Sequence, residues 1–358
     1  MKIRSNICIK LFALCVGLLC LAAAQSGHGQ IPGSKGYLLV TSFDNHSVFR
    51  YDAATGAFVD TFIPHRSGGL VQPWGIIFGP HDGQVYVSSG TFTPPAQKKA
   101  VLRYDAVTGA FLGDFTENGH LDSPRGIIFG PDGHLYVADR SPADNRLGRV
   151  VRYHGLTGQF LDQFVPDGFV GRPSGLVFGP KGRGRPGFDL YVASLPTSSI
   201  LQYDGATGEF ISEFVPSGSG GLSYPGGLVF GPDGNLYVTV LDLGKGDSVL
   251  RYQGPWSASP GAFIDAFVTP GSGGLTAPIG LLFGPDVNGD GVQDLYVTSG
   301  EQNPNFVTKP HTSAIKVYDG QTGAFIRDFV SPGSSGLDAP SYFTFTQTDP
   351  VTLNYLGE

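Results

Sequence analysis

The sequence has 358 residues, of which 54 are glycine, 27 are proline, 26 are phenylalanine and one is methionine. Glycine and proline interrupt helices and aromatic residues favour strands, so this composition excludes a largely helical fold. The formal net charge of −7, from 23 basic and 30 acidic residues, argues against nucleic acids and anionic membranes as partners.

The N-terminal segment has the order of a secretory signal peptide. Basic residues at Lys2, Arg4 and Lys10 precede or enter an apolar run, "LFALCVGLLCLAAA", which ends in small residues. This pattern predicts a Sec-type signal peptide over residues 1–24, a short linker over 25–35, and a secreted or periplasmic product. Without the three basic residues the net charge becomes −10. No other apolar stretch approaches spanning length, so we expect no membrane insertion after cleavage.

The three cysteines of the chain, Cys8, Cys15 and Cys20, all lie in this segment. The processed chain is therefore expected to contain no cysteine. Disulfides, thiolate metal sites and cysteine nucleophiles are excluded for it.

Two motifs then recur along the chain with a period of about fifty residues. "YDxxTGxF" begins at positions 51, 104, 153, 203 and 318, with a looser copy, "YQGPWSASPGAF", at 252. "PxGxxFGP" begins at Pro73, Pro124, Pro173, Pro225 and Pro278, and "PSYFTFT" from Pro340 is a degenerate sixth copy. The chain therefore consists of six repeats.

Each repeat predicts four short strands. An apolar first strand such as "GIIFG" leads through a Pro-Asp-Gly turn to "LYVxS", and a third strand reads "VLRYD". The Asp and Gly of "DxxTG" close a hairpin to the fourth strand, "GAFxxxF", since Asp accepts backbone amides and Gly takes a positive φ. Repeats of this size with four antiparallel strands are typical of propeller blades.

The chain ends predict how the ring closes. The first repeat begins at a second strand ("GYLLVTS", 36–42), while "SYFTFTQ" (341–347) is a lone first strand. Pairing them completes one blade and leaves no open edge. We therefore predict an all-β, six-bladed β-propeller of four-stranded antiparallel blades over 36–347, followed by a tail over 348–358.

The motifs "PxGLxFGPDGxLYV" and "RYDxxTGxF" resemble those of NHL-type propeller repeats in exported bacterial proteins. The resemblance is at the level of the superfamily that includes streptogramin lyase-like enzymes. That broad group also includes gluconolactonase-like hydrolases, peptide-amidating lyases and many binding modules. Amidating lyases use channel histidines, and no first strand here contains a histidine, so their mechanism has no matching positions in this chain. At the level of the superfamily, the resemblance implies a fold and no particular activity.

The loops between second and third strands vary most in length and charge, which is typical of recognition loops on a rigid scaffold. Carboxylates and arginines at the nearby channel mouth could bind a metal or an anionic group, or could simply be solvated or pair with one another. If the chain is an enzyme, the catalytic candidates are Arg125, Asp139, Arg140, His46 and His311. The candidate ligand contacts are Asp44, Trp74, Asp242 and Glu301.

The stretch "DVNGDGVQD" makes the first hairpin of the sixth repeat six residues longer than hairpins such as "FGPDGHLYV". It spaces oxygen ligands at alternate positions around a glycine, as calcium loops do, and it resembles the calcium loops of dockerins and integrin-type propeller hairpins. Val297 replaces the bidentate Glu of an EF-hand, and a plain hairpin turn is the alternative. The predicted ligands are Asp286, Asn288, Asp290, the Val292 carbonyl and Asp294.

We therefore predict an exported, monomeric binding or scaffolding module with a structural calcium site. Its ligand would be a protein, a carbohydrate or a small molecule on the loop-rich face. The alternative is a metal-dependent lyase or hydrolase, of the streptogramin lyase or gluconolactonase type, with a second divalent metal at the channel mouth. A third possibility is a surface or matrix protein whose propeller spaces other components.

Overall fold

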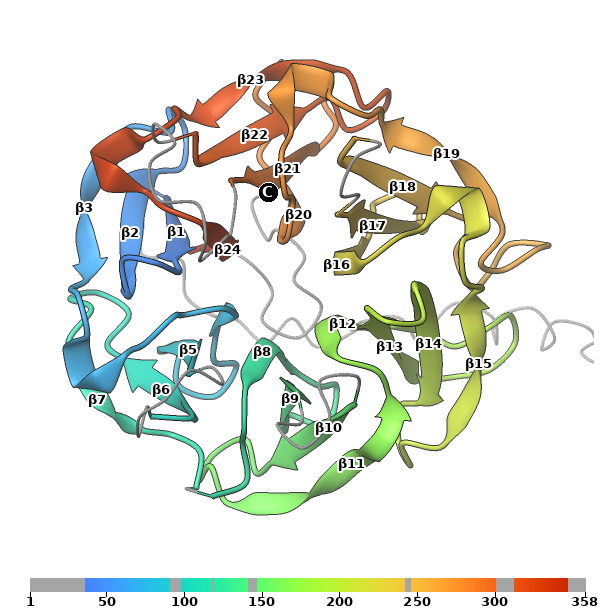
Figure 1. The fold of residues 1–358 in the computed structure, drawn as a ribbon, viewed down its shortest axis with the longest axis horizontal. Coiled ribbons are helices and arrows are strands. Elements are labelled where there is room, and N and C mark those ends of the chain that lie inside the picture. The colour runs from blue at the N-terminus through green and yellow to red at the C-terminus, as the bar shows by residue number, and fades with distance from the viewer. Residues whose placement is uncertain are drawn as a thin grey trace, which may run out of the picture. The chain divides into compact units, whose positions relative to one another are not determined.

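The computed structural model describes residues 36–90, 98–117, 119–140, 147–241, 246–300 and 312–346. These residues form six four-stranded antiparallel sheets, which stand as blades around a central axis (Figure 1). The predicted six-bladed all-β propeller is therefore confirmed. The predicted signal peptide, linker and C-terminal tail lie outside the described residues. Among the described residues, no helix has the length and apolar character needed to cross a membrane.

Each blade has the same order of strands from the axis outward. Blade 1 combines β24 with β1 to β3, and blades 2 to 6 use β4 to β7, β8 to β11, β12 to β15, β16 to β19 and β20 to β23. The innermost strands are β24 (Pro340–Phe345), β4 (Ile76–Phe78), β8 (Pro124–Phe129), β12 (Pro173–Pro180), β16 (Pro225–Phe230) and β20 (Leu281–Gly284). The second strands are β1 (Tyr37–Ser42), β5 (Val85–Ser89), β9 (Leu135–Arg140), β13 (Phe188–Ser194), β17 (Leu236–Val240) and β21 (Asp294–Ser299).

The outer half of each blade follows the same repeat. The third strands are β2 (Ser47–Asp52), β6 (Ala100–Tyr104), β10 (Gly148–Tyr153), β14 (Ser199–Asp204), β18 (Ser248–Tyr252) and β22 (Ala314–Tyr318). The outermost strands are β3 (Phe58–Ile63), β7 (Phe111–Asp114), β11 (Phe160–Val170), β15 (Phe210–Val215), β19 (Phe263–Val268) and β23 (Phe325–Val330). Short 3-10 turns precede four of the innermost strands: η1 (Ser67–Gly69), η2 (Ser219–Gly221), η3 (Ser272–Gly274) and η4 (Ser334–Gly336).

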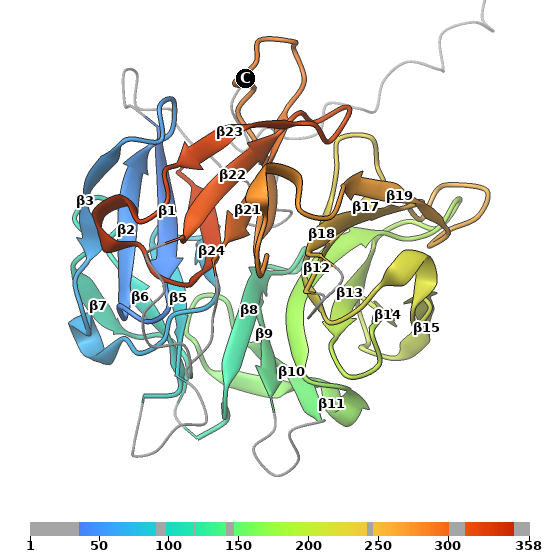
Figure 2. The ribbon, with the colours of Figure 1, turned by 45° about the horizontal axis from the view of Figure 1, so that its top comes forward.

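The first blade joins the two ends of the described chain, as predicted. Strands β24 and β1 pair antiparallel, with Leu38 opposite Phe345 (Figure 2). At the end of this ladder, the Tyr37 N–H donates to Thr346 Oγ1 at 3.0 Å and the Thr346 N–H donates to the Tyr37 carbonyl at 2.9 Å. The inner edge of β1 is therefore paired, and the ring closes without an open sheet edge at this point.

The "DxxTG" hairpins have the predicted turn chemistry. Asp52 Oδ1 accepts hydrogen bonds from the N–H groups of Ala54 and Thr55, and Gly56 has a φ of 74°. A second constraint was not predicted: a Cβ on Gly56 would lie 1.8 Å from the carbonyl oxygen of Phe329 in the neighbouring blade. The glycine is therefore required by the contact between blades as well as by the turn.

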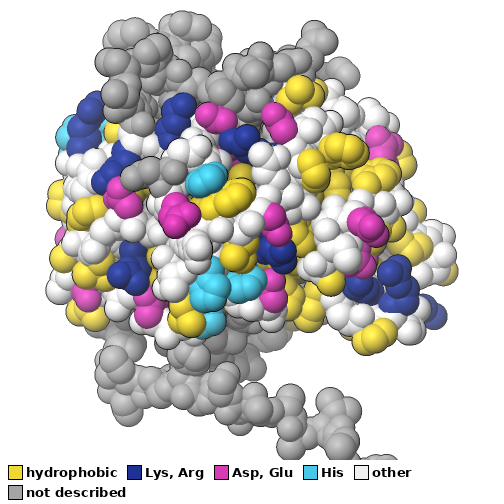
Figure 3. All heavy atoms as spheres, turned by 90° about the horizontal axis from the view of Figure 1, so that it is seen from below, with side chains coloured by type: hydrophobic (Ala, Val, Ile, Leu, Met, Phe, Trp, Pro, Cys, Tyr) yellow, Lys and Arg dark blue, Asp and Glu magenta, His cyan; other side chains and the backbone are white. Residues whose placement is uncertain are grey.

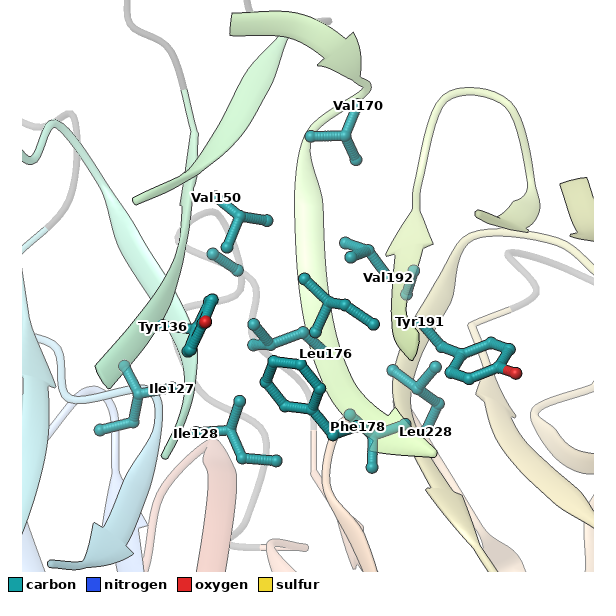
Figure 4. Packing of buried hydrophobic residues seen from close by; sticks show 14 of the residues in the cluster. Ile127, Ile128, Tyr136, Val150, Val170, Leu176, Phe178, Tyr191, Val192 and Leu228 are labelled. Atoms are coloured by element: carbon teal, nitrogen blue, oxygen red, sulfur yellow. The ribbon is translucent and has the colours of Figure 1, made fainter. Parts of the chain in front are cut away.

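Tyrosine and phenylalanine side chains join neighbouring blades in the core. Tyr136 of β9 makes edge-to-face contacts at 4.9 Å with Phe164 of its own blade and with Phe178 of the next blade (Figure 4). Such aromatic pairs stabilise by about 0.5–1.5 kcal/mol beyond their buried area. The same arrangement recurs at the tyrosines of the other "LYV" or "VYV" strands: Tyr86, Tyr191, Tyr237 and Tyr296.

The innermost strands approach one another backbone to backbone at the axis. A Cβ on Gly126 would lie 2.7 Å from the Ser174 carbonyl oxygen of the next blade, and the "PxG" glycines of blades 2, 4, 5 and 6 are similarly crowded. Hydroxyl side chains of the second strands reinforce this ring: Ser88 Oγ accepts from Gly75 N at 2.8 Å and donates to the Arg125 carbonyl at 2.7 Å. The "PxG" repeat is thus explained by a narrow axis.

Candidate functional site

We call the segment that joins the last strand of one blade to the first strand of the next a connector. In five of the six blades, a polar side chain at the end of the second strand forms a hydrogen bond with the connector that leads into the first strand of the same blade. Ser89 Oγ accepts from Val71 N at 2.9 Å, and Ser299 Oγ accepts from Thr276 N at 3.1 Å. Asp139 takes this place in blade 3. It is the structural counterpart of these serines.

Asp139 is fully buried, and both of its carboxylate oxygens are engaged. It accepts from Asp122 N and Ser123 N, and Arg149 donates to Oδ2 from Nε at 3.0 Å and from Nη2 at 2.9 Å. Burial raises the pKa of Asp139 to about 6, although Arg149 and the two amides oppose this. Its oxygens are committed to the connector and to Arg149, so Asp139 is not placed as a free catalytic base.

The hydrogen bond that His46 accepts has equivalents in other blades, where other side chains are the acceptors. His46 Nδ1 accepts a hydrogen bond from Gln72 N at 2.9 Å, and Gln72 directly precedes Pro73 of the "PxG" motif. The equivalent N–H groups of three other connectors donate to the side chains of Ser198, Asp247 and Ser313. Burial lowers the pKa of His46, and repulsion from Arg66 and His65 lowers it further. His46 therefore serves as a neutral acceptor for the chain.

Arg125 and Arg140 meet over Trp74 at the end of the channel where the connectors enter. The Arg125 guanidinium carbon lies 4.2 Å from the Trp74 ring centroid, and that of Arg140 lies 5.5 Å away. The three side chains are 4–6% exposed. Arg140 Nε donates to the Pro173 carbonyl at 3.3 Å, but Arg125 Nε, Arg125 Nη1 and Trp74 Nε1 have no acceptor among the described residues.

A third arginine, Arg172, belongs to the same group and was not predicted. Burial and repulsion by Arg172, offset in part by Asp139, lower the pKa of Arg125 to about 9. Burial and repulsion by both other arginines hold the pKa of Arg140 well below its usual range. Arg172 Nε is also buried without an acceptor among the described residues. We call Trp74, Arg125, Arg140 and Arg172 the arginine cluster.

Tyr342 closes off the axis beside the arginine cluster, and it too was missed. It stands where the other five blades have the "PxG" glycine. A Cβ on Gly175 would lie 2.7 Å from its hydroxyl oxygen and one on Gly227 would lie 3.4 Å away, so the ring of Tyr342 reaches across the axis from blade 1 to blades 4 and 5. Thr41 Oγ1 fixes it, since it accepts from Tyr342 N at 3.0 Å and lies 3.1 Å from the Trp74 carbonyl.

The predicted candidates therefore separate into four groups. Arg125, Arg140 and Trp74 converge, whereas Asp139 and His46 are bound to connectors. Asp44 is exposed, and partial desolvation and repulsion from Asp338 raise its pKa. The remaining candidates lie outside the described residues: Asp242, Glu301 and His311.

The predicted calcium loop is closed by hydrogen bonds to its own backbone. Asp286 accepts from Gly289 N and Gly291 N at 2.6 and 2.8 Å, and Asn288 Oδ1 accepts from Asp290 N at 3.0 Å. Asp290 Oδ1 accepts from Val292 N at 2.8 Å, while the buried Asp294 accepts from Val287 N. Within the described ranges no three His, Cys, Asp or Glu side chains form a group that could hold a metal ion. The calcium site therefore remains a prediction.

The face drawn in Figure 3 carries basic and acidic side chains interspersed over much of its surface. Among the described residues, partly exposed ion pairs include Arg103 with Asp82 at 3.5 Å. Three histidines lie near one another: the rings of His134 and His154 are 5.2 Å apart, and His81 Nε2 is 2.9 Å from the Gly133 carbonyl. The arginine cluster differs from these mixed surfaces because its three charged side chains all have the same sign.

No protein-family model matches the sequence, and no curated protein matches it significantly. Solved structures with a similar fold include a chain of a nidogen/laminin complex, with a TM-score of 0.59, 16% identity and coverage of 87% of this chain and 98% of that chain. An auxiliary nutrient binding protein from Bacteroides ovatus has a TM-score of 0.51 and 17% identity over 81% of this chain and 64% of that one. A PQQ-bound aldose sugar dehydrogenase from Streptomyces coelicolor has a TM-score of 0.51 and 20% identity over 80% and 90%. At these identities the similarity extends to the fold.

Proposed function

We propose that this chain is an exported NHL-like propeller that binds a ligand at the connector end of its channel without catalysing a reaction. One observation carries the proposal: Trp74, Arg125 and Arg140 are buried and the arginine cluster has donors with no acceptor among the described residues, whereas Asp139 and His46 accept hydrogen bonds from the backbone. A binding site needs fixed polar groups that meet a ligand, whereas hydrolysis or lyase chemistry also needs a free base or nucleophile within reach.

The similar structures are consistent with this function at the level of fold. They include a chain of a nidogen/laminin complex, an auxiliary nutrient binding protein and a PQQ-bound dehydrogenase. The resemblance of the repeat motifs to NHL repeats points to the same broad group. The competing hypothesis is a lyase or hydrolase with a divalent metal at the channel mouth. Three arginines at this end would repel such a cation, so the second metal is not part of our proposal.

The binding proposal is tested with a thermal-shift panel of neutral sugars, short peptides, carboxylic acids and phosphate esters, with each compound assayed for turnover in parallel. We expect one class to raise the melting temperature saturably and none to be consumed. His46→Ser should keep the response, because Ser198 and Ser313 perform the same task in other blades. Turnover of an ester or lactone that His46→Ser slows would establish the enzyme instead. The absence of any saturable shift would reject the binding proposal.

We also propose that the hairpin of Asp286 to Asp294 binds a structural calcium ion. The supporting observation is that Asp286, Asp290 and the buried Asp294 repel one another: this repulsion raises the pKa of Asp294 beyond the effect of burial. A divalent cation would offset that repulsion through the residues predicted as ligands. It would supply no chemistry beyond charge compensation and stiffening of the hairpin.

Calcium should therefore raise the stability of the wild-type chain, by about 2.7 kcal/mol at one hundred times its dissociation constant. A chelator should lower the melting temperature of the wild type and leave that of Asp290→Ala unchanged. Asp233→Ala is the matched control, because Asp233 occupies an ordinary hairpin turn where it accepts from Asn235 N at 3.0 Å. Equal responses to the chelator in wild type and Asp290→Ala would reject the calcium site.

A further inference from the structure

Four buried donor atoms of the arginine cluster have no acceptor in the part of the chain that the structure describes. They are Trp74 Nε1, Arg125 Nε, Arg125 Nη1 and Arg172 Nε. Native proteins leave few buried polar atoms unpaired, and an unpaired buried charge is costlier than an unpaired neutral group. Every one of these groups donates and none accepts. A ligand that satisfied them would have to present several acceptors at once.

The cluster also carries an excess of positive charge. Arg125, Arg140 and Arg172 repel one another, and the described carboxylate that acts on Arg125 is Asp139. Asp139 is already paired with Arg149, whose Nη2 also binds Asp122 Oδ2 at 2.7 Å. Among the described residues, this network leaves the three arginines of the cluster without a counterion of their own. Burial strengthens any interaction with a negative charge placed among them.

The cluster is rigid before any ligand arrives. Arg125 stacks on Trp74, and Phe43 contacts the Trp74 ring edge-on, with 5.7 Å between the ring centroids. Arg140 is tied to the Pro173 carbonyl, and Thr41 holds both the Trp74 backbone and Tyr342. Groups that are already ordered lose little conformational entropy when a ligand binds, so the donors are preorganised.

We propose that the arginine cluster binds a small anion with several clustered oxygen acceptors, of the kind presented by polycarboxylates and phosphate monoesters. This inference rests on the proposed binding function and specifies its ligand. Guanidinium groups match carboxylate and phosphate oxygens in geometry as well as in charge. Tyr342 limits the depth of the site, because its ring lies across the axis next to Arg140. A neutral sugar could accept hydrogen bonds here but would leave the charge uncompensated.

The test titrates the full chain with citrate and with phosphate at constant ionic strength, with sodium chloride as the reference salt and glucose as the neutral probe. Binding is followed by calorimetry and by the melting temperature. We expect one of the two anions to bind saturably, and which one binds identifies the source of the acceptor oxygens. Arg125→Met should weaken that binding roughly 10- to 100-fold, and Arg103→Met, which removes a surface arginine, should leave it unchanged.

Arg125→Met has a second readout that a purely structural arginine would not give. Without anion, this variant should melt at or above the wild-type temperature, because an uncompensated buried charge is replaced by an apolar chain of similar volume. Arg125→Lys keeps the charge but loses the fork and should bind with intermediate affinity. If Arg125→Met fails to fold, the affinity of Arg125→Lys for the anion is compared with that of the wild type instead.

Several outcomes would overturn the inference. Equal stabilisation of wild type and Arg125→Met by either anion would mean a general salt effect. If neither citrate nor phosphate binds saturably but glucose or another neutral compound does, the proposal of an anionic ligand is rejected and the proposed binding function stands. No saturable ligand of any class, or turnover of a compound, would reject the proposed function itself.

Discussion

Gly208→Ala should destabilise the propeller by about 3 kcal/mol or more, although it adds only one methyl group to a turn. Gly208 has a φ of 75°, and a Cβ there would lie 1.9 Å from the Phe164 carbonyl oxygen of the preceding blade. Backbone meets backbone at this point, so no side chain can turn aside to relieve the clash. Either the hairpin or the contact between the blades has to move. Denaturant unfolding followed by circular dichroism measures the effect.

Gly234→Ala is the matched control for this substitution. Gly234 also has a φ of 75°, but nothing lies within 4 Å of the position of its Cβ. This variant should lose only the cost of a left-handed alanine, about 1–2 kcal/mol. Equal losses in the two variants would mean that the contact with Phe164 contributes nothing to stability.

A chain that ends at Asp338, and so lacks β24, should lose cooperative unfolding. The matched control ends at Gln347, so that both chains lack the tail. Removing β24 leaves the inner edge of β1 unpaired and takes the buried Phe343 and Phe345 out of the core. Loss of one buried phenylalanine typically costs about 3–5 kcal/mol, so two approach the whole stability of an ordinary domain. The melting curve of the shortened chain should broaden or vanish.

A synthetic peptide of residues 338–347 provides the complementary experiment. Added to the shortened chain, it should restore a sharp transition, because it carries the missing strand and both phenylalanines. A scrambled peptide of the same composition should restore nothing. A shortened chain that melts at the control temperature without any peptide would mean that closure through β24 does not stabilise the ring.

Most of the architecture could be predicted because each repeat contains the partners of its own turns. Asp52 and Gly56 lie within one "YDxxTGxF" motif, so their roles follow from local spacing. Closure could also be predicted, since a lone first strand at one end and a missing one at the other specify the pairing. The contact of Gly56 with Phe329 was not accessible, because it depends on how closely two blades approach.

The site was predicted only in part, because its members come from different blades. Trp74, Arg125 and Arg172 lie at or just before the first strands of three successive blades, and only the packed ring brings their side chains together. Asp139 and His46 were interpreted as candidate catalytic groups because they are titratable. Register comparison of the repeats gives a different result, since Ser89 aligns with Asp139 and Ser198 with His46. The same comparison singles out Tyr342 as the one residue in place of a glycine.

The seam between β1 and β24 has a consequence for how the ring would respond to force. Tyr37, at the start of β1, lies beside Thr346, at the end of β24, so the two covalent exits from the seam are at the same end of the ladder. Tension applied between these two exits breaks the hydrogen bonds of the ladder one after another, whereas a shearing force would load all of them at once. The blade that holds the ring closed in solution is therefore also the blade at which pulling on both ends would open it first.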